Sequence, residues 1–336
     1  PSFAAAQATS PAVYRNTFRH RLTTGTWTLP IIAALAALTW LIIPLLPAGE
    51  GQACNRNWWL GLPLVAAITY GLVECNNRNA LLRVRSRMMG GTYLLFVMAC
   101  PALHSASWQC LPAAALLFAY FALFSTYGNP HAEGRVFHIF LPVGIASLLY
   151  APLVLLVPVL LFSLAVHIRI MSHRTFGAAL LGFLAPFWLV FGYTLWTGNT
   201  ESFFQYIIGI WQWQPTGLGG VPAWAVGSCC IIGLLSFVSS LHYLRTAFND
   251  KIRTRMFFYA ILMVHAVLLL LLILRPADYA ILLPMLAMNS APLVGHHLTL
   301  ARRRGSELWF YTCLLFLVVL LVANYFELWN SWLRFL

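Results

Sequence analysis

The sequence predicts an all-α membrane protein whose helices cross the bilayer many times. Of its 336 residues, 61% are hydrophobic and only 8% are charged. Apolar stretches of about 15 to 24 residues recur from residue 27 to the C-terminus. A helix of about 20 apolar residues crosses the hydrocarbon core, whereas a membrane β-barrel shows alternating strands of about ten residues. We therefore predict a polytopic transmembrane helical bundle.

About eleven spans follow from these stretches, separated by short polar or proline-containing connections. An N-terminal segment, residues 1–26, precedes a single transmembrane domain over residues 27–336. The predicted spans are 27–47, 57–74, 87–103, 109–126, 136–150, 152–167, 175–196, 222–244, 256–274, 279–295 and 307–329.

The stretch over residues 136–168 decides the orientation of every later span. As one unbroken helix it would be about 50 Å long, which exceeds a hydrocarbon core of about 30 Å. Two spans that meet at residues 150–152 place 17 of the 20 Lys and Arg residues on one side, and a single span divides them ten and ten. Because cytoplasmic loops are rich in Lys and Arg, we predict a cytoplasmic N-terminus and a periplasmic C-terminus.

The net charge of +12 would indicate nucleic-acid binding in a soluble protein. Here most basic residues lie in short loops between apolar segments, where they set orientation and attract anionic lipids. We predict membrane lipids as partners and no nucleic acid. Pro142, Pro152 and Pro158 in the two short spans are either ordinary kinks or a functional break.

An unusual loop, residues 197–224, contains no Lys or Arg and lies on the predicted outer face. Within it, SFFQYIIGIWQW can form an amphipathic helix in the membrane interface. Trp211, Trp213 and Trp224 then belong either to an aromatic belt at that interface or to a binding surface.

Arg275 and Asp278 lie in the predicted outer turn between two spans, where orientation rules give no reason for a cation. One interpretation is structural: Asp278 stabilises the N-terminus of the next helix and pairs with Arg275. The other places both in a binding cleft. Arginine suits phosphate, carboxylates suit sugar hydroxyls or base catalysis, and aromatic faces suit sugar rings. Further candidates on the same face are Glu50, Arg56, Trp58, Trp59 and Glu201.

The cytoplasmic loop ECNNRNALLRVRSR contains a second candidate site. Glu74 lies near the inner end of the second span and is followed by Asn76, Asn77 and Arg78. The asparagines can cap a helix and hold a tight turn. They can also line a pocket for an anionic headgroup, with the arginines of this loop as clamps. These arginines are Arg78, Arg83, Arg85 and Arg87.

Other ionisable and sulfur-containing residues give weaker signals. His265 lies deep in a span, as a functional group or as a neutral histidine hydrogen-bonded between helices. No spacing typical of a metal site or of a nucleotide or haem cofactor occurs, so we predict no metal and no cofactor. Cys100 and Cys110 could form a disulfide on the outer side. Cys229 and Cys230 are predicted to be buried apolar fillers.

Five stretches resemble a polytopic inner-membrane family of Bacteroidota, a resemblance that implies a bacterial inner-membrane location and no particular activity. These stretches are RLTTGTWTLP, ECNNRNALLRVRS, GRVFHIFLPVGIASLLYAPLVLLVPVLLFSL, RTFGAALLGFLAPFWLVFGY and DKIRTRMFF. More loosely, GIASLLYAPLVLLVPVLLFSL followed by LLGFLAPFWLVFGYTLWTGN is similar to integral-membrane glycosyltransferases that use polyprenyl-phosphate sugars. That resemblance implies a catalytic acid in the first outer loop, where Glu50 is the available acid.

These observations lead to three expectations for function. The first is a protein of envelope glycan or lipid assembly that handles a lipid-linked phosphate at the outer face. If it is an enzyme, Glu50 is the general base, Arg56 and Arg275 bind phosphate, and Asp278 orients them. The second is a non-catalytic subunit of an envelope assembly or secretion complex, with membrane protein partners. The third is a lipid or solute translocator, for which the sparse intramembrane charge gives little support.

Overall fold

The computed structural model describes residues 18–42, 61–105, 108–129, 131–211, 215–301, 305–326 and 328–329. Within these ranges the chain is helical and contains no strand. The helices of the first half are α2 (Phe18–Thr24), α3 (Thr28–Ile42), α4 (Gly61–Asn79), α5 (Met88–Ala99), α6 (Ala102–Ser105), η4 (Trp108–Cys110), α7 (Leu111–Ser125) and α8 (Glu133–Leu149). Those of the second half are η5 (Ala151–Leu155), α9 (Leu156–Phe162), η6 (Ser163–Ile168), α10 (His173–Trp196), α11 (Thr200–Trp211), α12 (Ala223–Thr246), η7 (Ala247–Asn249), α13 (Ile252–Leu274), η8 (Pro276–Asp278), α14 (Tyr279–Leu300) and α15 (Gly305–Tyr325).

Each of the eleven predicted ranges overlaps a helix, which confirms the all-helical class. Seven helical stretches of the described chain are long and apolar enough to cross a membrane, or up to eight if α2 and α3 count as one span bent by 83°. The helices α4, α5 and α8 do not meet that test: α5 has 12 residues and α8 has 17, and the last turns of α4 are polar. The structure thus supports a multi-pass membrane protein and leaves eleven spans as the finer prediction.

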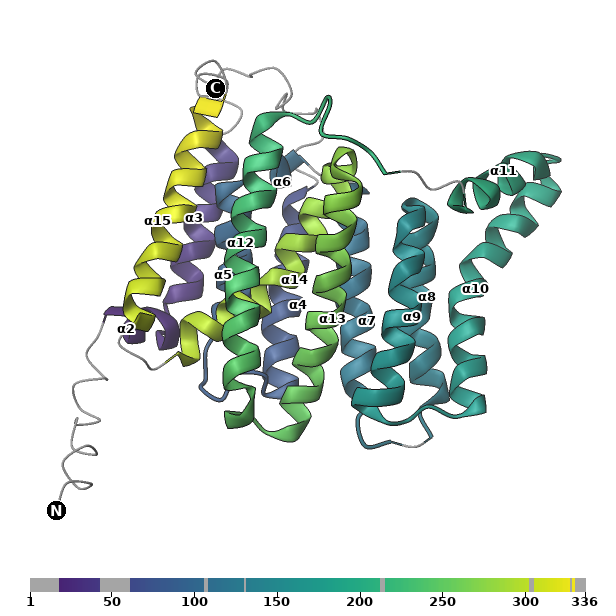
Figure 1. Cartoon of the computed structure of the whole chain (residues 1–336), viewed down its shortest axis with the longest axis horizontal. Coiled ribbons are helices and arrows are strands. Elements are labelled where there is room, and N and C mark those ends of the chain that lie inside the picture. Colours follow the sequence, from purple (N-terminus) through teal and green to yellow (C-terminus); the bar gives the residue numbers. More distant parts are fainter. Residues whose placement is uncertain are drawn as a thin grey trace.

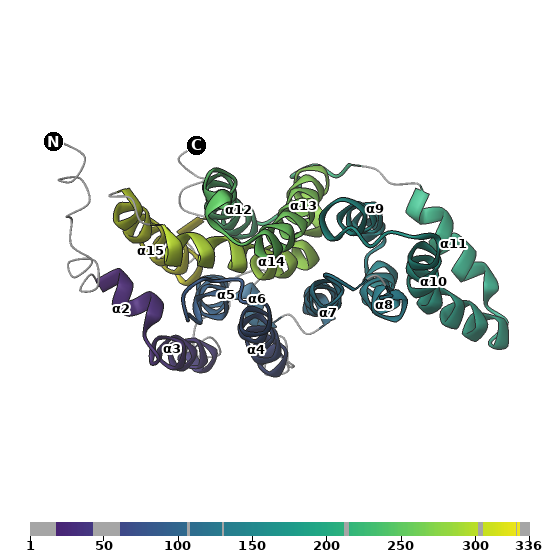
Figure 2. The same ribbon diagram turned by 90° about the horizontal axis from the view of Figure 1, so that it is seen from below.

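The long helices run roughly parallel to one another and form two rows (Figures 1 and 2). One row contains α15, α12, α13, α9 and α10, and the other contains α3, α5, α4, α7 and α8. The helix α14 lies between the rows and is the most buried of the membrane-capable stretches, with 72% of its apolar window inside the protein. It therefore forms the centre of the hydrophobic core.

The chain reverses at Tyr150, as the two-span prediction requires (Figure 1). The helix α8 ends at Leu149, Tyr150 is extended, and η5 begins with Pro152 in its first turn. Proline lacks a backbone N–H and fits the start of a helix, so it favours this turn. The returning stretch is irregular, because η5 and the π-helical η6 flank the single α-helical segment α9.

Close packing joins α8 to α10 through two glycines. A Cβ at Gly144 would lie 2.5 Å from the carbonyl oxygen of Phe183, and a Cβ at Gly182 would overlap the carbonyl of Phe137. Small residues allow this approach, which is a common way to pack helices in membranes. Beyond α10, the predicted amphipathic helix is present as α11, which lies across the end of the bundle (Figure 1).

Candidate functional site

Basic side chains gather at one end of the helices. Of the fourteen Lys and Arg residues that the structure describes, thirteen lie at the end where α3, α5, α8, α10 and α13 begin, which we call the basic end. The fourteenth, Arg275, lies at the opposite end, which we call the Arg275 end. The thirteen are Arg19, Arg21, Arg78, Arg83, Arg85, Arg87, Arg135, Arg169, Arg174, Arg245, Lys251, Arg253 and Arg255.

Arg275 is held by two neighbours at the turn between α13 and α14. Its Nε lies 2.7 Å from Oδ2 of Asp278. The Tyr150 hydroxyl, at the turn after α8, donates to the same carboxylate oxygen at 2.8 Å. Burial raises the pKa of the Tyr150 phenol, and its bond to Asp278 raises it further, so the hydroxyl stays protonated and can donate.

The structure confirms the ion pair that the structural interpretation of this turn predicted. Asp278 does pair with Arg275, and it occupies the N-cap position of α14. Its side chain makes no capping hydrogen bond to that helix, because its carboxylate is bound by Arg275 and Tyr150. The nitrogens Nη1 and Nη2 of Arg275 have no hydrogen bond or ion pair with the described residues, and the side chain is 25% exposed. They can therefore bind an anion.

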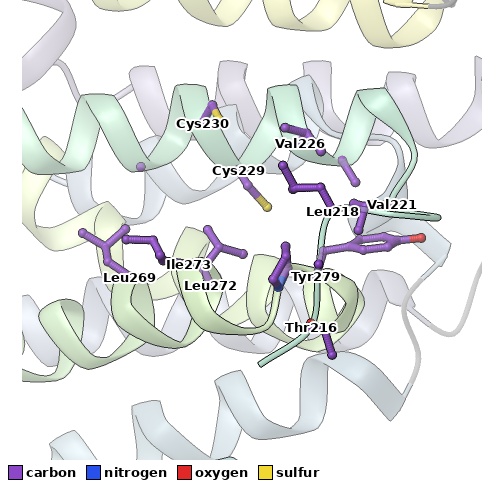
Figure 3. A pocket seen from close by; sticks show the side chains of 14 residues that line it. Thr216, Leu218, Val221, Val226, Cys229, Cys230, Leu269, Leu272, Ile273 and Tyr279 are labelled. Atoms are coloured by element: carbon purple, nitrogen blue, oxygen red, sulfur yellow. The ribbon is translucent and has the colours of Figure 1, made fainter. Parts of the chain in front are cut away.

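An apolar groove of about 500 Å³ lies beside this turn, between α12 and α13 (Figure 3). Ile273 and Pro276, which flank Arg275 in the sequence, both line it. Cys230 lines it from α12 and is exposed, so the prediction that this residue is a buried filler is wrong. We call this cavity the Cys230 groove.

The segment after residue 214 closes one side of the Cys230 groove. The backbone N–H of Thr216 donates to the carbonyl of Leu274 at 2.9 Å, and the N–H of Ala277 donates to the Thr216 hydroxyl at 3.4 Å. These bonds fix the segment against the turn that carries Arg275. The Cys230 groove thus has mostly apolar walls, and Arg275 lies in the adjacent turn without lining the groove itself.

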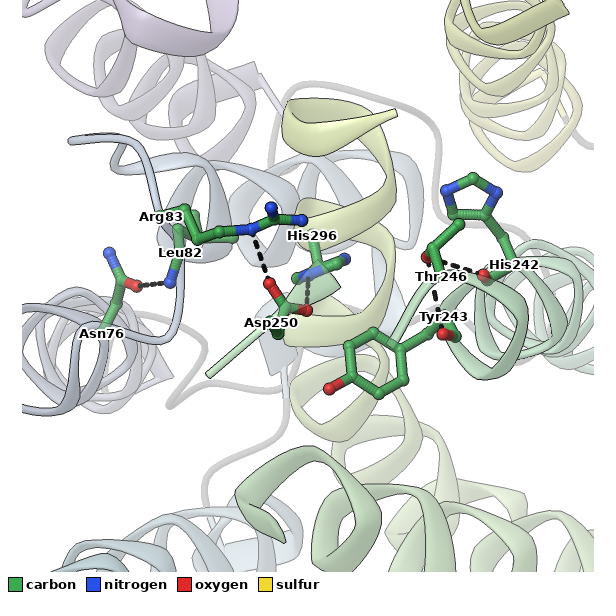
Figure 4. Close-up of polar contacts among 8 residues, drawn as sticks. All are labelled: Asn76, Leu82, Arg83, His242, Tyr243, Thr246, Asp250 and His296. Carbon is green, nitrogen blue, oxygen red and sulfur yellow. Dashed lines mark hydrogen bonds and ion pairs between the residues drawn. The ribbon is translucent and has the colours of Figure 1, made fainter. Parts of the chain in front are cut away.

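A second polar cluster, which the sequence did not reveal, lies at the basic end (Figure 4). Asp250 follows η7, and its side chain is fully buried. Its two carboxylate oxygens lie 2.6 Å from Nε of Arg83 and 3.1 Å from Nε2 of His296. One acid thus joins the connection after α4, the connection before α13 and the buried helix α14. The sequence offered one signal for this cluster: Asp250 is one of only eight acidic residues, and it lies beside a helix end.

Asn76 holds the turn between α4 and α5, which was one of the two interpretations of this residue. Its Oδ1 accepts from the backbone N–H of Leu82 at 2.9 Å, and its Nδ2 donates to the carbonyl of Ser86 at 3.0 Å. The side chain is buried, and these two bonds fold the connection between α4 and α5 back onto α4. Asn76 is therefore unavailable to a ligand.

A second groove, also of about 500 Å³, runs between α3 and α4. The predicted residues Glu74 and Asn77 line one end of it together with Arg87, one of the arginines predicted as clamps. Arg78 does not line it and instead binds Glu74, with Nε 2.6 Å from Oε1. That hydrogen bond is the main reason why the pKa of Arg78 is raised. We call this cavity the Arg87 groove.

Of the other five predicted site residues, the structure describes only Glu201. Glu50, Arg56, Trp58 and Trp59 lie outside the described residues. Glu201 is exposed on α11, where it accepts a hydrogen bond from Gln205 of the same helix at 3.2 Å. No contact between described residues links it to Arg275 or Asp278, so the face on which they were predicted to meet is too broad for Glu201 to reach them.

His265 is hydrogen-bonded between helices, as one interpretation expected. Asn289 of α14 donates from Nδ2 to Nδ1 of His265 at 3.4 Å and accepts from the Tyr120 hydroxyl. All three side chains are buried. The disulfide prediction is wrong, because Cys100 and Cys110 are both free. Each lies buried within the helix packing.

Comparison with known proteins found no matching family model, no matching curated protein and no matching solved structure.

Proposed function

We propose that this chain is a multi-pass protein of the bacterial inner membrane that binds a lipid-linked phosphate for cell-envelope glycan or lipid assembly. In this proposal the chain crosses the membrane eleven times, the basic end faces the cytoplasm and the Arg275 end faces the periplasm. The phosphate binds Arg275, and the polyprenyl chain lies in the Cys230 groove.

The observation that carries the proposal is the position of Arg275 beside that groove. Arginine binds phosphate through several N–H donors of its planar guanidinium group. Asp278 contacts only Nε of Arg275, at 2.7 Å. This contact orients the guanidinium group and leaves Nη1 and Nη2 for a ligand. An apolar chain gains free energy from the groove walls, and the headgroup extends from the groove to Arg275 in the adjacent turn.

The position of Arg275 also needs an explanation other than topology. Basic residues at the other end retain their loops in the cytoplasm, but an arginine on the far side does not contribute to that effect. Its pair with Asp278 neutralises one charge with another and is partly open to water, so it adds little to stability. Binding an anionic ligand is a function that requires a cation at this place.

If the protein is also an enzyme with a glycosyltransferase-like scaffold, Glu50 is the general base for group transfer. Asp278 is bound by Arg275 and Tyr150 and is therefore assigned the orienting role. Glu50→Gln separates an enzyme from a non-catalytic subunit. Binding survives in both cases, and transfer is lost only if the protein is an enzyme.

Binding is tested with undecaprenyl phosphate added to the delipidated protein in nanodiscs, with native mass spectrometry as the readout. Arg275→Gln is expected to weaken binding about tenfold or more, because a hydrogen bond to a charged group contributes roughly 1.5–3 kcal/mol. Arg245→Gln, an exposed arginine at the basic end of α12, is the matched control and is expected to change binding less than about twofold.

The groove is tested separately with Cys230→Phe, which fills it. Leu234→Phe is the control, because Leu234 is exposed one turn further along α12 and does not line the groove. Only Cys230→Phe is expected to weaken binding of the polyprenyl chain. Wild-type binding by both Arg275→Gln and Cys230→Phe would contradict the proposal.

A further inference from the structure

We infer that the Arg87 groove is a separate binding site for an anionic glycerophospholipid, with the lipid phosphate on Arg87 and one acyl chain between α3 and α4. This inference does not depend on Arg275 or on the Cys230 groove. It concerns the other end of the molecule and a different set of helices.

The walls of the groove fit an acyl chain. Ala33 and Ala37 of α3 and Ala66 of α4 line it and are exposed, so small side chains leave a channel that opens away from the core. Along α4 the groove extends from Leu62 to Asn77, which corresponds to about 22 Å of helix. One leaflet contributes about 15 Å of hydrocarbon, so the groove has room for a chain and part of its headgroup.

Charge at the end of the groove favours an anion. Arg87 lines it, is exposed, and has no side-chain hydrogen bond or ion pair with any described residue. The acid at this end, Glu74, is already bound by Arg78 at 2.6 Å. The net charge that remains for a ligand is therefore positive.

Arg87 also occupies the N-cap position of α5, so the positive end of that helix dipole adds to its charge. The residue before it is held in place by two hydrogen bonds. The neighbouring Ser86 hydroxyl donates to the carbonyl of Thr23, and the Ser86 carbonyl accepts from Asn76 at 3.0 Å. The guanidinium group thus extends from a fixed point at the end of the groove.

The chemistry favours a phospholipid over a free phosphate, because the apolar length of the groove contributes nothing to the binding of a small anion. It favours an anionic headgroup over a zwitterionic one, because Glu74 is already paired and a cationic choline group would find no free acid there. The site is at the basic end, where anionic lipids also meet the other arginines.

The test measures lipid bound to the whole protein in nanodiscs of phosphatidylcholine that contain a small fraction of phosphatidylglycerol. We expect the purified protein to retain phosphatidylglycerol in preference to phosphatidylcholine. Arg87→Gln is expected to weaken this retention about tenfold, and Arg87→Lys is expected to restore part of it. Arg85→Gln is the matched control, because Arg85 is exposed in the same connection and does not line the groove.

A second pair of variants tests the acyl chain. Ala66→Leu fills the groove and should reduce retention, whereas Ala67→Leu, at an exposed neighbouring position that does not line it, should leave retention unchanged. Inorganic phosphate added at the same concentration should not displace the lipid. Equal losses from Arg87→Gln and Arg85→Gln would show diffuse surface attraction and overturn the inference, as would full retention by Ala66→Leu.

Failure here and failure of the proposed function remain distinguishable. The variants Arg87→Gln and Ala66→Leu should bind undecaprenyl phosphate like the wild type. The variants Arg275→Gln and Cys230→Phe should retain phosphatidylglycerol like the wild type. Loss of both ligands in a single variant would instead indicate one shared site and would contradict the separation of the two grooves.

Discussion

Asp250 and Asp278 bind arginine in the same way but in different surroundings. Each carboxylate lies close to an arginine Nε, at 2.6 Å for Arg83 and 2.7 Å for Arg275. Each also has a second polar neighbour, His296 for Asp250 and Tyr150 for Asp278. The Asp250 side chain is fully buried, whereas that of Asp278 is 24% exposed.

This difference distinguishes a structural contact from the proposed binding site. Asp250 joins segments that are 167 residues apart in the sequence, at Arg83, and 46 residues apart, at His296. Asp278 binds an arginine only three residues away, which is open to an anion on its other side. The same pair of residue types therefore stabilises the fold at the basic end and presents a cation at the Arg275 end.

The largest expected effect is that of Asp250→Ala. It leaves His296 buried without its acid and disconnects two segments from α14. We expect a loss of about 3 kcal/mol in the free energy of unfolding, at the low end for a broken buried pair because Arg83 is 41% exposed and can turn to water. Thermal unfolding in detergent measures this loss. Asn249→Ala, at an exposed neighbouring position, is the control and should have little effect.

A smaller effect is expected from pH at the Arg275 end. Burial lowers the pKa of His104 from 6.5 to about 4, while its Nδ1 donates to the carbonyl of Pro101 at 3.2 Å. The unfolded chain binds a proton below pH 6.5 and the folded chain only below about pH 4. Stability contributed by neutral His104 is therefore present above pH 6.5 and is lost as the pH falls toward 4.

Between pH 7 and pH 5 this loss should amount to about 2 kcal/mol. Unfolding of the wild type and of His104→Gln at both pH values measures it, because glutamine does not titrate in this range. Equal pH dependence in the two proteins would show that His104 is not responsible.

The smallest expected effect on stability is that of Asp278→Ala. Because its ion pair with Arg275 is about a quarter exposed, we expect a loss of about 1 kcal/mol or less. Tyr150→Phe removes one hydrogen bond to the same carboxylate and should cost a similar amount. If Asp278→Ala destabilised the protein as much as Asp250→Ala, the contrast between the two aspartates would be wrong.

Local features of the sequence predicted the helices better than they predicted the contacts between them. The count of Lys and Arg over the whole chain placed the reversal at residues 150–152. Apolar stretches located the helices, because that signal lies within short segments. A structural turn was one of the two interpretations of Asn76 for the same reason. The contacts of Asp250 with His296 and of Asp278 with Tyr150 join residues 46 and 128 positions apart, so no local pattern contains them.

Arg87 shows a different limit. Together with its neighbours Arg83 and Arg85, it was one of the arginines predicted as clamps for an anionic headgroup. Only the structure distinguishes the three: Arg83 binds Asp250, Arg87 lines a groove, and Arg85 does neither. The role of a basic residue in such a loop therefore depends on which helices pack beside it, which the sequence of the loop does not contain.

The central claim is that the two aspartates lie on opposite sides of a membrane, with Asp250 inside. Single cysteines at the exposed neighbours Ala277 and Asn249, in a chain whose seven native cysteines are replaced, test it most directly. A membrane-impermeant maleimide applied to intact cells should label Ala277→Cys, and should label Asn249→Cys only after the cells are permeabilised. Labelling of both positions from outside, or of Asn249→Cys alone, would contradict this account.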